Sequence, residues 1–174
     1  MLSFLMLCIG IQAQTTLISP TGDGGFENGA TLAANGWTAV NGTTNTWNVG
    51  TAAFASGANS AYISNNNGTG YVYSNGTSAV AHFYRDVTFP AGETSISFSF
   101  KLKGDGDIFS GTYYDKLMVY SAPTTFTPTT ASPASSGTAL AGATLIYAQA
   151  GNYGTAYVTI AGTLPASFAG TTQR

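Results

Sequence analysis

The clearest hydrophobic pattern in the chain is a strict alternation of apolar and polar residues over 95–103. A period of two places all the apolar side chains on one face of a strand and the serines and lysines on the other. The apolar members are Ile96, Phe98, Phe100 and Leu102. The pattern predicts a half-buried antiparallel strand with one face toward a core and the other toward water.

Other segments follow the same rule less completely. Residues 81–89 alternate, and Pro90-Ala91-Gly92 predicts a turn into the strand at 95–103. Further candidate strands are 116–120, 144–148 and 156–160, with a weaker one around Tyr62 and Ile63 that a turn at Asn65–Gly68 ends. No segment has a convincing helical period of 3.6, and no capping box opens an apolar helical run. The fold class is therefore predicted to be all-β and antiparallel.

Residues 1–13 differ from the rest of the chain. Leu2–Ile11 is mostly apolar and has the length of a signal-peptide core, which is too short to span a bilayer. Ala13 suits a cleavage site, but no Lys or Arg precedes Arg85. Either the signal is atypical or the chain starts at an internal Met of a longer product, and we favour the second. We expect an incomplete signal peptide, export to the cell surface or medium, and a single domain over 14–174.

Composition narrows the function classes. Charged residues make up 7% of the chain, against about 25% in an ordinary domain, while aromatic residues make up 13%. Such a chain does not have the composition of a disordered one. Five basic residues and a net charge of −2 provide no electrostatic surface for nucleic acid or anionic lipid. We expect a globular domain with neither nucleic acid nor a membrane span among its partners.

Candidate catalytic chemistry is sparse. His82 is the only histidine and Cys8 the only cysteine, which argues against a histidine-based triad and a zinc site. A glycosidase needs two carboxylates at a controlled separation. The seven carboxylates here lie mostly in apparent turns or beside cations, as Asp86 lies beside Arg85. We therefore predict no catalytic activity.

Two further segments have turn-rich composition. Residues 122–142 are rich in Pro, Thr, Ser and Ala, and we interpret them as a long surface loop within one domain. Gly22–Gly29 is dense in glycine around Phe26, which predicts the entry strand of the domain. Asp23 and Glu27 stand four residues apart in this block, so both could turn toward one calcium ion. Asp105 and Asp107 are expected at the tip of a hairpin.

Four short motifs occur in a set order: Phe26-Glu27-Asn28-Gly29, Gly36-Trp37, a second tryptophan at Trp47, and 114–119. In this order and rough spacing they resemble the cleaved-adhesin or MAM-like jelly-roll family, common in secreted and surface proteins of Bacteroidetes-type bacteria. The resemblance covers most of residues 22–174 and implies an antiparallel β-sandwich of jelly-roll type. It also implies a structural calcium that pins the terminal strands, with Asp23 and Glu27 as ligands. Family members continue beyond a segment like 164–170, so we expect the domain to be C-terminally incomplete and to lack a final Asp ligand.

Aromatic side chains are the remaining candidates for ligand contact. A pyranose ring can stack its C–H groups on exposed tyrosine or tryptophan faces. We assign this role to Tyr71, Tyr73, Tyr113 and Tyr114, and interpret Trp37 and Trp47 as core residues. The leading hypothesis is a non-catalytic adhesion or carbohydrate-binding module of a larger multidomain protein, with a glycan or a cell-surface protein as partner. The alternatives are an accessory module of a secreted glycoside hydrolase or peptidase, and a structural spacer.

Overall fold

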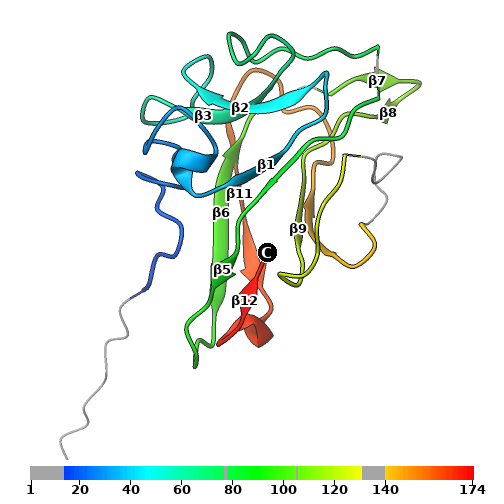
Figure 1. Cartoon of the computed structure of the whole chain (residues 1–174). Helices are drawn as coiled ribbons and strands as arrows, with labels where there is room; N and C mark the ends of the chain where they lie inside the picture. The colour runs from blue at the N-terminus through cyan, green and yellow to red at the C-terminus, as the bar shows by residue number, and fades with distance from the viewer. Residues whose placement is uncertain (1–13, 77, 105, 131–139) are drawn as a thin grey trace, which may run out of the picture.

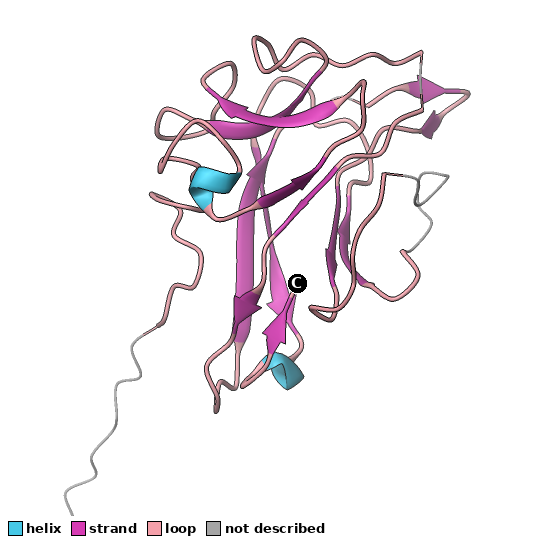
Figure 2. Cartoon of the chain, viewed as in Figure 1, coloured by secondary structure: helices cyan, strands magenta, loops and turns pink. Residues whose placement is uncertain are grey.

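The computed structural model describes residues 14–76, 78–104, 106–130 and 140–174. The predicted leader at 1–13, Asp105 and the middle of the loop at 122–142 lie outside these ranges. Within them the regular structure is β, apart from two single-turn 3-10 helices, η1 (Ala33–Asn35) and η2 (Ala166–Phe168) (Figure 2). In these same ranges no helix has the length and apolar character needed to cross a membrane.

The described strands are short, and they pair two by two. In chain order they are β1 (Thr38–Val40), β2 (Thr46–Gly50), β3 (Ser60–Ser64), β4 (His82–Tyr84), β5 (Val87–Thr88), β6 (Ile96–Leu102), β7 (Ile108–Phe109), β8 (Thr112–Tyr113), β9 (Met118–Ser121), β10 (Thr144–Ala148), β11 (Val158–Leu164) and β12 (Thr172–Gln173). The pairs are β1–β4, β2–β3, β5–β12, β6–β11, β7–β8 and β9–β10, all antiparallel. The prediction of an all-β antiparallel fold is confirmed. The arrangement is consistent with a β-sandwich, and the jelly-roll order stays a prediction.

The β6–β11 ladder is the longest and confirms the alternation at 95–103. Ile96 is buried and the other apolar members are half-buried, while the intervening serines and Lys101 are exposed. Phe98 lies over Gly162 of β11, where a Cβ atom would stand only 2.8 Å from its ring. Phe100 packs edge-on against Tyr147 of β10, with 5.5 Å between ring centroids. This contact places the β9–β10 pair against one face of the β6–β11 pair.

Most predicted strands are present with shifted ends. The segment 144–148 coincides with β10, and 116–120 and 156–160 overlap β9 and β11. The segment 81–89 is divided into β4 and β5, because Arg85 and Asp86 between them leave the ladder. The pattern did not reveal β1, β2, β7, β8 or β12, which have two to five residues each.

Two local predictions were wrong. The glycine-dense block is a run of turns rather than an entry strand, and Phe26 has a left-handed φ of 62°. The hairpin tip is Ser110-Gly111, with φ of 53° and 79°, whereas Asp107 directly precedes β7 at the base of the hairpin and Asp105 lies outside the described residues. Two successive left-handed residues form the turn that best fits a two-residue hairpin, so the tip lies where these residues are.

The end of the chain joins two parts of the fold. β12 pairs with β5, while Arg174 donates its N–H to the Ala122 carbonyl (2.8 Å) and accepts from the Ala122 N–H (2.9 Å). Figure 1 shows β12 between β5 and β9. At the opposite end of the long ladder lie the loop 65–76, the β7–β8 hairpin and the loop 149–157, which together present the candidate ligand-binding residues (Figure 1).

Candidate functional site

The loop after β3 carries three consecutive exposed side chains. Tyr71 is 50% exposed, Val72 47% and Tyr73 36%, in a domain whose other large apolar side chains are mostly covered. The loop itself is ordered by Asn45, whose amide donates to the Ser74 carbonyl (3.0 Å) and accepts from the Ser74 N–H (2.9 Å). Exposed aromatic rings therefore stand on a backbone that is tied to β2.

Lys103, which directly follows β6, contacts Tyr71. Its ammonium lies 4.4 Å from the centroid of the Tyr71 ring and donates to the Tyr71 hydroxyl at 3.3 Å. The same ammonium lies 5.8 Å from the ring of Tyr157. Cation–π contact restricts the orientation of Tyr71 while its other surface stays open to water.

Tyr113 and Tyr114, the other predicted pair, differ in exposure. Tyr113 belongs to β8 and is half-buried, because its ring packs against the backbone of Gly151. Tyr114 is 50% exposed, and its N–H donates to the Asp107 carbonyl at 2.9 Å. Tyr71 and Tyr114 are presented at the same end of the molecule by different segments, and in the described residues no ring contact or hydrogen bond joins them.

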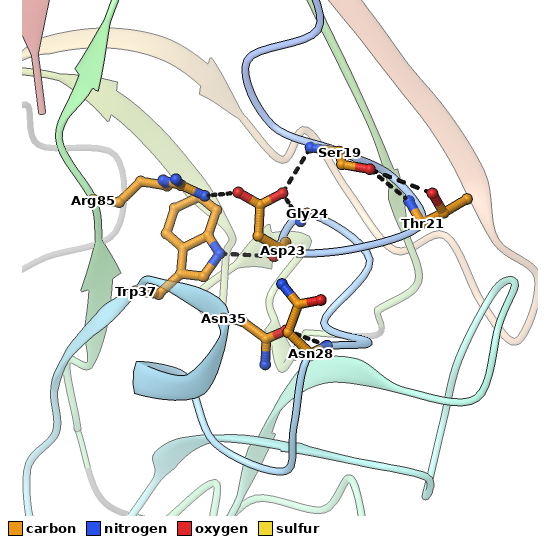
Figure 3. A network of polar contacts seen from close by, with 8 residues as sticks. All are labelled: Ser19, Thr21, Asp23, Gly24, Asn28, Asn35, Trp37 and Arg85. Atoms are coloured by element: carbon orange, nitrogen blue, oxygen red, sulfur yellow. Dashed lines mark hydrogen bonds and ion pairs between the residues drawn. The ribbon is translucent and has the colours of Figure 1, made fainter.

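Asp23 is held by a dense set of donors (Figure 3). One carboxylate oxygen accepts from the N–H groups of Ser19 (2.7 Å) and Gly24 (2.9 Å), and the other pairs with the Arg85 guanidinium at 2.5 Å. Desolvation acts to raise the pKa of Asp23, but the hydrogen bond from Arg85 and those from the backbone outweigh it, so the pKa lies below its usual value. Glycine is required next to this carboxylate, because a Cβ at Gly24 would stand 2.6 Å from Ile18.

Glu27 points to a different segment. One of its oxygens accepts from the N–H groups of Ala58 (2.9 Å) and Asn59 (3.0 Å), and the other from the Asn59 side chain (3.0 Å). These backbone donors lower the pKa of Glu27, as the Asn59 side chain also does. The side chain ties the glycine-dense block to the loop between β2 and β3.

These contacts bear on the predicted calcium site. Calcium takes oxygen ligands, whereas the oxygens of Asp23 and Glu27 face N–H donors and, in Asp23, a guanidinium. As they lie, the two side chains do not fit a common calcium site. Across the described ranges no cluster of three or more His, Cys, Asp or Glu residues could hold a metal. Calcium binding by Asp23 and Glu27 stays a prediction.

Asn35 is a structural residue that sequence reasoning missed. It is 1% exposed, its amide donates to the carbonyls of Gly29 (2.9 Å) and Thr31 (2.8 Å), and it accepts from the Asn28 N–H (2.9 Å). It thereby closes the loop that leads from the glycine-dense block to Trp37. From the sequence, an Asn before Gly36-Trp37 indicates only a turn residue. The sequence pattern therefore did not predict that Asn35 closes this loop.

The two tryptophans form an aromatic cluster with Phe83 of β4. The Phe83 centroid lies 5.1 Å from Trp37 and 4.8 Å from Trp47, both in edge-to-face geometry, and Phe26 adds a contact of 6.2 Å with Trp37. Both tryptophans are only half-buried. Each tryptophan is therefore only partly a core residue. Trp37 and Trp47 also line a groove of about 420 Å³.

His82 is placed on β4 with its Nε2 3.2 Å from the Thr129 carbonyl, so it connects the strand to the loop after Ala122. Asp86 is next to Arg85 in the sequence, but in the structure it pairs with Arg174 at 2.8 Å.

Searches of protein-family models, curated proteins and solved structures find no match for this chain. The resemblance to the cleaved-adhesin or MAM-like family therefore stays a prediction.

Proposed function

We propose that this chain is a non-catalytic module that is exported and binds a glycan at the cell surface or in the medium. The observation that carries the proposal is the run Tyr71-Val72-Tyr73, exposed on a loop that the Asn45 side chain holds in place. A ligand that stacks on an ordered aromatic surface loses little affinity to ordering the protein. Export is supported by the apolar segment at 2–11.

The chemistry of the exposed surface suits a sugar. Tyrosine offers an apolar face for pyranose C–H groups and a hydroxyl for hydrogen bonding, at a low cost in side-chain entropy. Tyr71 is in contact with Lys103, which fixes the ring. Tyr114, equally exposed at the same end, offers a further aromatic contact.

Binding of the full chain to an array of oligosaccharides tests the proposal. For the tightest-binding glycan we expect Tyr71→Ala/Tyr73→Ala to weaken affinity about tenfold or more, as loss of an aromatic contact does in binding sites. Leu145→Ala is the matched control, since Leu145 is an exposed apolar residue (42%) on β10. It should bind as the parent chain does. A folded parent chain that binds no glycan, or binds only a protein partner, overturns the proposal.

A further inference from the structure

A groove separates the Trp37 segment from β2. β1 pairs with β4 and β2 with β3, so the facing edges of β1 and β2 are not joined to each other. Asn41 holds the turn between the two strands, because its side chain accepts from the Trp47 N–H (2.8 Å) and donates to the Trp47 carbonyl (3.2 Å). Beyond this point lies the groove of about 420 Å³, a volume within the range of small-ligand sites.

The two indoles that line the groove are fixed before any ligand arrives. Trp37 donates its Nε1–H to the Asp23 carbonyl (3.1 Å) and Trp47 to the Ala81 carbonyl (3.0 Å). Phe83 packs edge-on against both rings. Stacking against these indoles therefore costs no rotamer freedom and leaves no buried N–H group without a partner.

None of the described residues that line the groove is charged. Its apolar lining residues are Ala30, Leu32, Ala33, Ala39 and Val49 together with the two tryptophans. Its polar lining residues are Thr31, Thr38 and Asn48. Arg85 lies 5.2 Å from the Trp37 ring, but its charge is paired with Asp23. An uncharged ligand with an apolar face and a rim of hydroxyl groups matches this lining, and an anionic one does not.

The tyrosine loop lies on the other side of β2 from the two indoles. A Cβ atom at Gly68 of that loop would stand 3.3 Å from the Asn48 side chain. Because neighbouring side chains of a strand point to opposite faces, Asn48 faces the loop, whereas Trp47 and Val49 face the groove. The groove is therefore a contact separate from the tyrosine loop.

From these observations we infer that the groove is a subsite for one neutral hexopyranose unit, stacked on Trp37 or Trp47, of a glycan that this chain binds. The inference rests on the proposed function, and it names the sugar unit that determines which glycan is bound.

A substitution that fills the groove tests this without removing an aromatic ring. Ala39→Phe on β1 should weaken binding of the tightest neutral oligosaccharide on the array at least tenfold, measured by calorimetry on the full chain. Ala161→Phe is the matched control, an exposed alanine on β11 away from the groove. It should bind as the parent chain does. Ala33→Phe, which fills the groove from η1, is the second variant if Ala39→Phe does not fold.

The outcomes separate the two proposals. If the parent chain binds glycan and the groove-filling variants bind equally well, while Tyr71→Ala/Tyr73→Ala is impaired, the groove inference is wrong and the proposed function stands. Equal affinity for a neutral oligosaccharide and its uronic acid counterpart also contradicts the inference, because no lining residue that the structure describes is a cation for a carboxylate. If the folded parent chain binds no glycan, the proposed function fails and the inference fails with it.

Discussion

The neighbouring residues Arg85 and Asp86 each form an Arg–Asp ion pair, and the two pairs connect this segment to different parts of the molecule. Arg85 pairs with Asp23, 62 residues earlier, and the adjacent Asp86 pairs with Arg174, 88 residues later. Successive side chains of an extended segment point to opposite sides, so the junction of β4 and β5 contacts the N-terminal block on one side and the C-terminal residue on the other. In each pair the arginine also lies over an aromatic ring, Trp37 for Arg85 and Tyr84 for Arg174.

The pairs differ in how much else surrounds them. The Asp23 side chain is 24% exposed and shares its carboxylate among Arg85 and two backbone N–H groups, next to the tryptophan cluster. Asp86 is 39% exposed, and Arg174 binds it in bidentate fashion at 2.8 and 3.0 Å. Water and salt weaken an exposed pair more than one within a packed cluster. The Asp23 pair should therefore matter more to folding, and the Asp86 pair should respond more to salt.

The largest expected effect follows removal of the Arg85 charge. Arg85→Met leaves the Asp23 carboxylate without its cation beside Trp37, and we expect it to lower the free energy of unfolding by about 2 kcal/mol. Urea unfolding followed by tryptophan fluorescence measures the loss. Lys101→Met removes an exposed cation of β6 and should change stability by less than about 0.5 kcal/mol. Equal losses in the two variants would mean that the Asp23 pair is no more than a surface contact.

A smaller effect is expected from Asp23→Asn, with a distinct dependence on pH. The pKa of Asp23 is lowered in the folded state, so its ionised form stabilises the fold above the ordinary value of 3.8. That contribution is lost as the pH falls through the lowered pKa. At pH 7 we expect the variant to be less stable by about 1 kcal/mol. The gap between parent and variant should close as the pH falls below about 4, in urea unfolding measured from pH 7 to pH 2.5. A gap that stays constant would show that the carboxylate charge is not what stabilises the block.

This comparison also shows how far sequence reasoning reaches. The alternation at 95–103 predicted β6 because a half-buried strand needs only a local period of two. The partners of Arg85 and Asp86 could not be predicted. Their adjacency in the sequence suggests only that these two opposite charges neutralise each other. Their true partners lie 62 and 88 residues away, and only the folded arrangement of β4, β5 and the chain end brings them together.

The candidate site shows the same limit. Tyr71, Tyr73 and Tyr114 are exposed, as their glycine-rich surroundings predicted, while their role in ligand binding stays a prediction. Tyr113 was indistinguishable from Tyr114 by composition, and only the packing of Gly151 against its ring separates them. The tryptophan groove had no sequence signal of its own, because it depends on β1 and β2 not pairing although they follow one another in the chain. The left-handed φ of Phe26 is likewise unpredictable for an aromatic residue, whose ring is held by Trp37 and Phe83.

The smallest expected effect comes from Arg174→Met. It removes the bidentate contact with Asp86, the hydrogen bond from the guanidinium to the Phe126 carbonyl and the cation 4.2 Å from the Tyr84 ring. Both backbone hydrogen bonds with Ala122 remain. Because Asp86 is well exposed, we expect a loss of less than about 1 kcal/mol at low salt. In about 0.5 M NaCl the difference in free energy of unfolding between variant and parent chain should shrink further, because salt screens exposed ion pairs. Urea unfolding at the two salt concentrations measures both quantities. If Arg174→Met proved as costly as Arg85→Met and insensitive to salt, the contrast between an enclosed pair and an exposed one would be wrong. Asp23 and Arg174 would then contribute equally to the stability of the fold through their pairs with Arg85 and Asp86.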